Sequence, residues 1–345
     1  MRPSRQNKTG GIISVLWGPF GFRADELASS IGAERISVTF LYGPRYFAPL
    51  RYLVLFFRTL LILFRKRPRI VYAQNPPVFC PLTCLLYCDL TATRLVIDHH
   101  SIWRVKTLGR GPVSRLIGML EAIVARRAYA NTAPHRFWAQ QLAAVGAQRV
   151  IVVHDFVERN PRLRSETLRS EYSDGSLIAI SSHGGHPLER MEEEAVAVGR
   201  VEGVKLLITG PTAKLENRLS ASTLPRNVRY LGFLERETYE QLKASSDMAI
   251  NITDEPYTLS HVLLEFAASA LPIISSRQEA VEDFFGDSLL YVGSSNPDVI
   301  AEQVTTFKDE RVRTQYKQRI MTRYSQLEAS NKAQIESLRR LFGVS

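Results

Sequence analysis

Acidic side chains are scarce at the N-terminal end of the chain. The first 70 residues hold 3 Asp or Glu against 12 Lys or Arg, whereas the remaining 275 residues hold 31 against 32. Nearly all of the net charge of +10 therefore belongs to the first fifth of the sequence. A local excess of this kind favours an anionic partner, either a membrane surface or a nucleic acid.

Cysteine is also rare, because Cys80, Cys84 and Cys88 are the only three in 345 residues. They recur every four residues and would line one face of a helix. No histidine lies nearby at ligand spacing, and the spacing is not that of a zinc site. We expect reduced thiols in the core and no metal site.

No hydrophobic run is long enough to cross a membrane without interruption. The most apolar stretch, residues 46–69, is broken by Arg58, and a spanning helix needs about 20 predominantly apolar residues. An interfacial helix, with its apolar side in lipid and its basic side on anionic head groups, fits this pattern. A core helix with one solvated basic stripe fits it equally. The residues that would meet the head groups are Arg51, Arg58, Arg65, Lys66 and Arg67.

The basic N-terminus does not have the pattern of a signal peptide. The apolar run that follows it, Ile12–Trp17, has only the length of a strand. We therefore expect a cytoplasmic protein that associates peripherally with the inner face of the membrane.

Strand-like and helix-like segments alternate in two successive series. The first series runs from Ile12–Leu16 to Val150–Val153, and the second begins at Leu177–Ile180. This order predicts an α/β protein with two Rossmann-like, doubly wound domains. We expect the first domain at residues 1–160, a linker at 161–175, the second domain at 176–325, and a C-terminal helix at 326–345 that packs back on the first domain.

The most informative stretch is residues 248–276, which predicts a strand, a turn, a helix and a second strand. Its helix carries a single acidic side chain, Glu265, and Thr258 and Ser260 are helix N-cap types. A helix N-terminus at the carboxyl end of a parallel strand binds anions through its backbone amides. We therefore expect a phosphate-bearing ligand at residues 258–260. His261 lies one helical turn before Glu265 and could either pair with a diphosphate or be a plain surface histidine.

Polar residues also follow other predicted strands, at the edge where open α/β sheets bind ligands. The first half has two clusters of polar residues after its strands. It also has a glycine turn, whose sequence does not match the dinucleotide-binding motif. In the second half, Ser182 could donate a hydrogen bond to a phosphate, or it could only stabilise the turn. The residues in question are Gly18, Gly21, Gln74, Asn75, Asp98, His99, His100, Ser182, His183 and Gly210.

Several segments together resemble the glycosyltransferases of the two-Rossmann-domain (GT-B) fold, close to the family 4 type. The segment NVRYLGFLERETYEQLKASSDMAINIT resembles the family's strand, "GFL", short helix and "SSD" that precede the donor helix. SHVLLEFAASALPIISS resembles the signature K-x-x-E-x-x-A-x-G-x-P-V-x-x-S. YAQNPPVFCP and LVIDHHS are similar to the QNPP and IDWHN elements of the dolichol-pathway chitobiosyl β-mannosyltransferases.

The resemblance implies two domains that face a central cleft and a hexosyl transfer that needs neither metal nor cofactor. The donor would be a UDP- or GDP-linked sugar, and the acceptor a lipid-linked or polysaccharide glycan at the membrane face. Glu265 matches the glutamate that accepts hydrogen bonds from the ribose hydroxyls, while Tyr257 stands where the family's first paired glutamate is expected. The donor-binding set implied is Ser182, His183, Gly210, Lys214, Glu255, Tyr257, Thr258, Leu259, Ser260, His261 and Glu265.

A transfer that inverts the sugar needs a base from the N-terminal half to deprotonate the acceptor hydroxyl. Asp98, His99 and His100 are the candidates, and Asp98 could instead be a buried structural acceptor. Gly18, Gly21, Gln74 and Asn75 would line the acceptor side.

Two other functions compete with a membrane-associated glycosyltransferase. A non-catalytic protein of the same fold could dock a true transferase at the membrane, which the Tyr257 position favours. A nucleic-acid binder is suggested by the basic charge, but the basic residues alternate with aliphatic rather than stacking aromatic residues. We therefore favour the enzyme and expect no nucleic acid partner.

Overall fold

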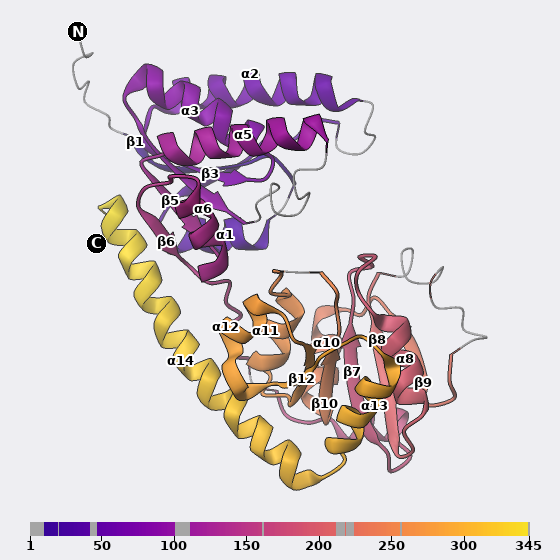
Figure 1. Ribbon diagram of the computed structural model, residues 1–345. Helices are drawn as coiled ribbons and strands as arrows, with labels where there is room; N and C mark the ends of the chain where they lie inside the picture. Colours follow the sequence, from indigo (N-terminus) through magenta and orange to yellow (C-terminus); the bar gives the residue numbers. More distant parts are fainter. Residues whose placement is uncertain are drawn as a thin grey trace. The chain divides into compact units, whose positions relative to one another are not determined.

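The computed structural model describes residues 10–19, 21–41, 47–100, 111–160, 162–211, 218, 224–255 and 257–343. The chain divides into two compact units (Figure 1). Unit 1 comprises the residues up to Asp155 together with those from Ser330 onward, and unit 2 comprises Phe156–Ala329.

Unit 1 is a six-stranded parallel sheet in the order β2-β1-β3-β4-β5-β6. Its strands are β1 (Gly10–Leu16), β2 (Glu34–Ser37), β3 (Pro68–Asn75), β4 (Arg94–His99), β5 (Ala130–Ala133) and β6 (Val150–Val152). Its helices are α1 (Phe22–Ser30), α2 (Ala48–Lys66), α3 (Phe79–Thr91), α5 (Pro112–Arg127) and α6 (Arg136–Ala144).

Alternate residues of the unit 1 strands point to opposite faces, as in any strand. Ile13 and Val15 belong to a core cluster with residues of α2, α3 and α5, whereas Ile12 belongs to a second cluster with residues of α1. The second cluster also contains Leu338 and Phe342, near the end of the last helix. Helices therefore cover both faces of the sheet, which makes the unit doubly wound.

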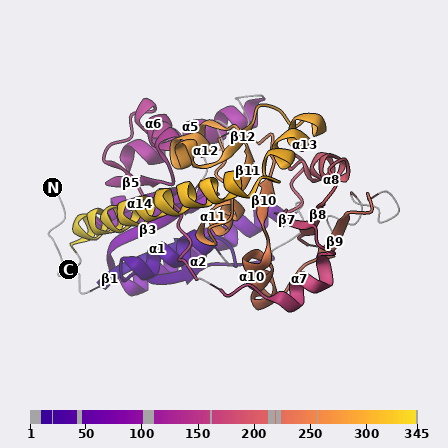
Figure 2. The same cartoon turned by 90° about the horizontal axis from the view of Figure 1, so that it is seen from below.

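Unit 2 repeats this architecture with a parallel sheet in the order β12-β11-β10-β7-β8-β9. Its strands are β7 (Leu177–Ser182), β8 (Val204–Thr209), β9 (Val228–Gly232), β10 (Met248–Asn251), β11 (Ile273–Ser276) and β12 (Leu290–Val292). Its helices are α7 (Glu166–Tyr172), α8 (Met191–Gly199), α10 (Arg236–Ser245), α11 (His261–Ala268), α12 (Glu279–Phe285), α13 (Pro297–Thr306) and the 3-10 turn η2 (Gly286–Ser288). The helix α7, inside the expected linker, packs beside α10 (Figure 2).

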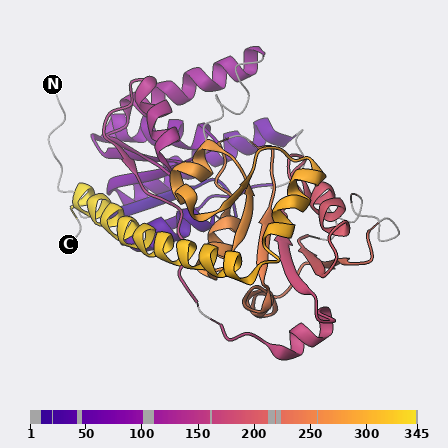
Figure 3. The same cartoon turned by 60° about the horizontal axis from the view of Figure 1, so that its bottom comes forward.

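The last helix, α14 (Glu310–Phe342), contributes residues to both units (Figure 3). Ile320, Tyr324 and Leu327 belong to a core cluster of unit 2. In unit 1, Arg339 donates a hydrogen bond to the carbonyl of Ser30, and Phe342 packs edge-on against Tyr72.

The expected fold class is confirmed, and the cysteines lie in the core as expected. Cys80, Cys84 and Cys88 are buried on one side of α3 as free thiols. Among the residues described, no helix combines the length and the apolar character needed to span a membrane.

Candidate functional site

The helix α11 presents Glu265 at the carboxyl edge of the unit 2 sheet. Leu263, Leu264, Phe266 and Ala267 are buried, because they pack against the sheet. Glu265 lies between them in sequence but keeps 26% of its side chain exposed. The apolar spacing thus fixes the helix and leaves one carboxylate partly in solvent.

A relay of hydroxyl groups holds the Glu265 carboxylate. The Tyr239 hydroxyl on α10 donates to Glu265 Oε2 over 3.0 Å and accepts from Ser182 Oγ, also over 3.0 Å. Ser182 Oγ in turn lies 2.7 Å from Thr209 Oγ1. Because each hydroxyl has one proton, Thr209 donates to Ser182, Ser182 to Tyr239 and Tyr239 to Glu265. Sequence reasoning found Ser182 and Glu265 but missed Tyr239 and Thr209.

Tyr239 remains a donor throughout the physiological pH range. Burial raises the pKa of its phenol strongly, and the neighbouring negative charge of Glu265 raises it further. On the other side of the carboxylate, His261 Nε2 lies 3.8 Å from Glu265 Oε1. This confirms that His261 and Glu265 share a helix face. A carboxylate held from both sides has its remaining lone pairs available for a diol.

His183, which directly follows β7, is buried rather than exposed at the carboxyl edge of the unit 2 sheet. Ser181 Oγ donates to Glu194 Oε2, so its single proton is used, and His183 Nε2 must donate to Ser181 Oγ at 2.7 Å and Glu194 Oε2 at 3.0 Å. Glu194 Oε1 accepts from the Ile252 amide over 2.7 Å. Burial opposes a charge on His183, but the charge and hydrogen bond of Glu194 outweigh it and raise the histidine pKa.

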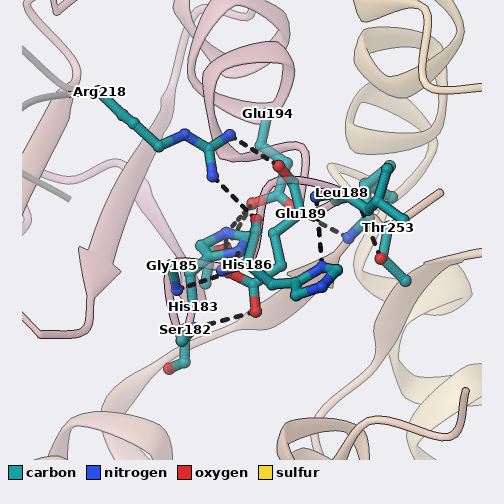
Figure 4. A network of polar contacts seen from close by, with 12 residues as sticks. Ser182, His183, Gly185, His186, Leu188, Glu189, Glu194, Arg218 and Thr253 are labelled. Carbon is teal, nitrogen blue, oxygen red and sulfur yellow. Dashed lines mark hydrogen bonds and ion pairs between the residues drawn. The ribbon is translucent and has the colours of Figure 1, made fainter. Parts of the chain in front are cut away.

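In the loop after β7, backbone amides donate hydrogen bonds to a carboxylate a few residues further along the chain (Figure 4). The amides of Gly184, Gly185 and His186 donate to the Glu189 carboxylate over 3.0, 2.8 and 3.0 Å. Arg218 donates to both oxygens of Glu192 and to the carbonyls of His186 and Glu189. Glutamate and arginine in polar loops gave no sequence signal for this network.

The turn between β10 and α11 holds the other residues expected at the donor. The Glu255 amide donates to Thr253 Oγ1, and Glu255 Oε2 lies 3.7 Å from His186 Nδ1. Tyr257 adopts a left-handed backbone with φ of 61°. Thr258, Leu259 and Ser260 lead directly into the N-terminus of α11, where Ser260 is the N-cap residue.

Gly210 directly follows β8, and its carbonyl accepts from the Tyr230 hydroxyl over 3.0 Å. Lys214 lies outside the described residues.

In unit 1, the Asp98 carboxylate is enclosed by hydrogen-bond donors. Arg23 on α1 donates to both of its oxygens over 2.9–3.1 Å, and Thr132 donates to Oδ1 over 2.8 Å. Arg23 and Asp98 expose 3% and 2% of their side chains, and Arg23 also pairs with Asp155. A carboxylate enclosed in this way has both oxygens occupied by donors of its own unit and cannot readily contact an acceptor hydroxyl. The geometry thus favours the structural alternative for Asp98 over a general base.

His99 is enclosed in a similar way. Its Nε2 lies 2.9 Å from Asn131 Oδ1, and its Nδ1 lies 3.3 Å from Asn75 Nδ2. The Asn131 amide nitrogen donates to the carbonyls of Ala125 and Gln148, so its oxygen faces His99 and Nε2 carries the proton. Burial lowers the pKa of His99 to about 4. A neutral, bonded ring orients the end of β4.

His100 is the exposed member of the cluster, and its amide donates to the Asn75 carbonyl over 3.0 Å. Gln74 lies near the end of β3, opposite Asp98 in the strand register, with its Oε1 buried and without a hydrogen-bond partner among the described residues. A Cβ on Gly21, the N-cap residue of α1, would come within 3.3 Å of that oxygen. Gly18 is buried in the preceding turn.

Two family models match this chain. A "Glycosyl transferase 4-like domain" matches residues 16–155, and a "Glycosyl transferase-like" model matches residues 189–338. Together they cover most of the 345 residues. No curated protein matches the chain at the significance required of a relative.

Several solved structures share the fold. HepE of Anabaena, solved with UDP and glucose, has a TM-score of 0.74 at 13% identity over 95% of this chain and 99% of its own. Sucrose-phosphate synthase from Thermosynechococcus elongatus has a TM-score of 0.79 at 12% identity over 97% and 100%. WaaG, a glycosyltransferase involved in lipopolysaccharide biosynthesis, has a TM-score of 0.68 at 11% identity over 96% and 99%.

Two parallel Rossmann-like units of this kind define the GT-B class of glycosyltransferase folds. The chain belongs to the group 1, family 4-like glycosyltransferases and is a glycosyltransferase enzyme. The narrower resemblance to the dolichol-pathway β-mannosyltransferases stays a prediction.

Proposed function

We propose that this glycosyltransferase moves a hexose from a UDP- or GDP-linked donor to a lipid-linked or cell-surface glycan at the cytoplasmic face of the membrane. The observation that carries the proposal is Glu265, a partly exposed carboxylate in the middle of the helix that follows β10; it accepts a hydrogen bond from Tyr239 and lies 3.8 Å from His261. HepE, of the same fold, has been solved with UDP-glucose, which supports a nucleotide-sugar donor.

The donor would lie along the turn and first residues of α11. Glu265 accepts hydrogen bonds from both ribose hydroxyls, since a carboxylate has two oxygens for a diol. The diphosphate meets the amides of residues 258–260, where the helix dipole favours negative charge. His261, which is 40% exposed, adds a proton donor when it is protonated. Glu255 and Tyr257 border the sugar.

The acceptor side belongs to unit 1. We assign the base to His100, because Asp98 and His99 are enclosed while His100 is exposed at the end of β4. In an inverting transfer the acceptor oxygen forms a bond to the anomeric carbon as the bond to the leaving diphosphate breaks. The acceptor proton passes to His100. Gly18, Gly21, Gln74 and Asn75 would border the acceptor.

Donor binding tests this proposal most directly. UDP- and GDP-sugars are titrated calorimetrically into the wild-type protein, Glu265→Gln and the surface control Glu282→Gln. We expect one nucleotide class to bind, a loss on the order of tenfold in Glu265→Gln, and no change in the control. A protein that binds no sugar nucleotide would overturn the proposal.

A further inference from the structure

The outer surface of α2, α3 and α5 is largely apolar. These three helices cover one face of the unit 1 sheet, and α3 contacts both α2 and α5 (Figure 1). Their exposed hydrophobic side chains range from 39% exposed for Phe79 to 67% for Val113. We name this surface the helical platform; it consists of Leu50, Leu53, Phe57, Leu61, Phe64, Phe79, Leu86, Leu90, Val113, Leu116 and Met119.

The helix α2 shows the feature most clearly because it is apolar on two sides. Leu55 and Leu63 are buried against the domain core. Leu53, Phe57 and Leu61 recur every four residues on the outer side and are about half exposed or more. A surface helix normally turns polar residues outward, so the second apolar side has no role in the core of unit 1.

The exposed hydrophobics are concentrated in the helical platform. It holds eleven of the seventeen large hydrophobic side chains that are exposed in the described part of the chain. Unit 2 has four, Leu163, Val196, Phe233 and Met321, each on a different segment. Single exposed hydrophobics are ordinary, whereas a contiguous set indicates an interaction surface.

The charge of the same helices indicates what covers this surface. The sequences of α2, α3 and α5 hold seven Lys or Arg and two Asp or Glu. Of the two acids, Glu121 is buried and Asp89 is paired with Arg127. A second copy of this chain packed on the helical platform would bring two positively charged surfaces together. An anionic bilayer instead offers both an apolar interior and the opposite charge.

We propose that the helical platform inserts into the interfacial layer of an anionic bilayer, with its three helices parallel to the membrane. Arg65 and Arg115, exposed on α2 and α5, meet the head groups. This deepens the membrane attachment of the proposed function and changes its contact residues. Arg51 and Arg58 donate to the carbonyls of Leu41 and Thr39 over 3.2 and 3.0 Å, so they hold α2 to its own unit.

Vesicle flotation tests the helical platform with matched variants of the full chain. The α2 variant carries Leu53→Gln, Phe57→Gln and Leu61→Gln, and the α5 variant carries Leu116→Gln and Met119→Gln. The control carries Leu163→Gln, Val196→Gln and Met321→Gln, the same kind of change on unit 2. Vesicles are either pure phosphatidylcholine or contain phosphatidylglycerol, at low and high salt.

The wild type and the control should float with the anionic vesicles. The α2 variant should lose at least about tenfold in partitioning because three apolar side chains leave the lipid. The α5 variant should also bind more weakly, which separates a three-helix surface from a single helix. Residual binding to neutral vesicles should fall in the same order.

Three results would overturn the proposal. They are equal flotation of the α2 variant and the control, no flotation of the wild type, and a wild-type dimer in solution that the α2 variant disrupts. Circular dichroism and melting temperature establish that each variant is folded. Nucleotide-sugar binding without vesicles should be equal in all variants. A failure of that binding in the wild type would refute the donor proposal and leave the flotation result standing.

Discussion

The two units place a histidine at comparable points, at the carboxyl end of a central strand, yet the pKa values of the two rings are shifted in opposite directions. His99 in unit 1 is buried against the amides of Asn75 and Asn131, and burial lowers its pKa to about 4. His183 in unit 2 is equally buried but hydrogen-bonded to Glu194, and its pKa is raised. The position in the fold does not decide the direction of the pKa shift; the neighbouring carboxylate does.

Unit 1 also has a carboxylate next to its histidine, but that carboxylate is already engaged. Asp98 is taken by Arg23 and Thr132, so its attraction for a proton on His99 is the weakest influence on that pKa. In both units the buried cluster lies at the strand end, and the side chains that we propose to contact ligands are its more exposed neighbours. These neighbours are His100 in unit 1 and His261 with Glu265 in unit 2.

The largest effect should come from removing the arginine that engages Asp98. Arg23→Met leaves Asp98 buried without its cation, so we expect a loss of about 3–5 kcal/mol in the free energy of unfolding. Urea denaturation measures it. Adding Asp98→Asn to Arg23→Met should restore part of the loss, because the buried charge is then gone.

The matched control for Arg23→Met is Arg127→Met. Arg127 and Asp89 form an ion pair with both side chains about half exposed. We expect a change below about 1 kcal/mol in the free energy of unfolding. Equal losses in the two variants would contradict a buried structural role for Arg23.

The next effect concerns the dependence of stability on pH in unit 1. The folded pKa of His99, about 4, lies below its unfolded value of about 6.5, so the folded state resists protonation. Its contribution is complete above the unfolded pKa and is lost as pH falls through the folded pKa. The loss should amount to about 3 kcal/mol across that window.

Comparison with His99→Gln isolates this contribution, since the variant should be less stable at pH 7 but lose less stability on acidification. His100→Gln is the control, because it makes the same substitution at an exposed neighbour and leaves the His99 ring in place. Denaturation midpoints at pH 4.5 and 7 give the slopes. A wild-type slope retained in His99→Gln would refute the assignment.

A smaller effect is expected when the pKa of His183 is shifted in the same direction as that of His99. Glu194→Gln removes the charge but keeps the side-chain shape, so burial is no longer outweighed and the pKa of His183 should fall below its ordinary value. We expect a loss of about 1–3 kcal/mol at neutral pH. In the wild type the raised pKa stabilises the fold below the unfolded pKa, and this stability is lost as pH rises through the folded value.

NMR titration of the His183 ring measures the direction of its pKa shift in the wild type and in Glu194→Gln. Ser181→Ala serves as control, since it removes a hydrogen bond at Glu194 and keeps the charge. Its histidine pKa should stay raised. A raised pKa that persists in Glu194→Gln would show that another group supplies the charge.

The elements could be predicted from the sequence wherever local patterns carry the signal. The apolar spacing of α11 and the lone acid at Glu265 gave the helix and its face correctly. β5 was missed because its sequence, ANTA, has two polar residues, which are buried through pairing with strands distant in sequence. The polar stretch taken as a linker contains α7, whose Ser165 side chain accepts from the Leu168 amide.

The partners of the candidate site could not be predicted because they are set by the tertiary fold. Asp98 and Arg23 are 75 residues apart, and no local spacing links them. His183 and Glu194 lie on a strand end and the following helix, and the pattern does not show that both are buried. Sequence reasoning therefore located the strand ends that bear polar groups but could not separate the enclosed groups from the exposed ones.

The smallest expected effect tests whether Tyr239 positions Glu265. Tyr239→Phe removes the hydroxyl that donates to Glu265 Oε2 and keeps the ring in place. If that hydrogen bond orients the carboxylate for the ribose, nucleotide-sugar affinity should fall about fivefold to tenfold with little change in melting temperature. Tyr230→Phe is the control, because its hydroxyl bonds the Gly210 carbonyl instead. An affinity loss shared equally by the two variants, or absent from Tyr239→Phe, would mean that Glu265 is held without the relay.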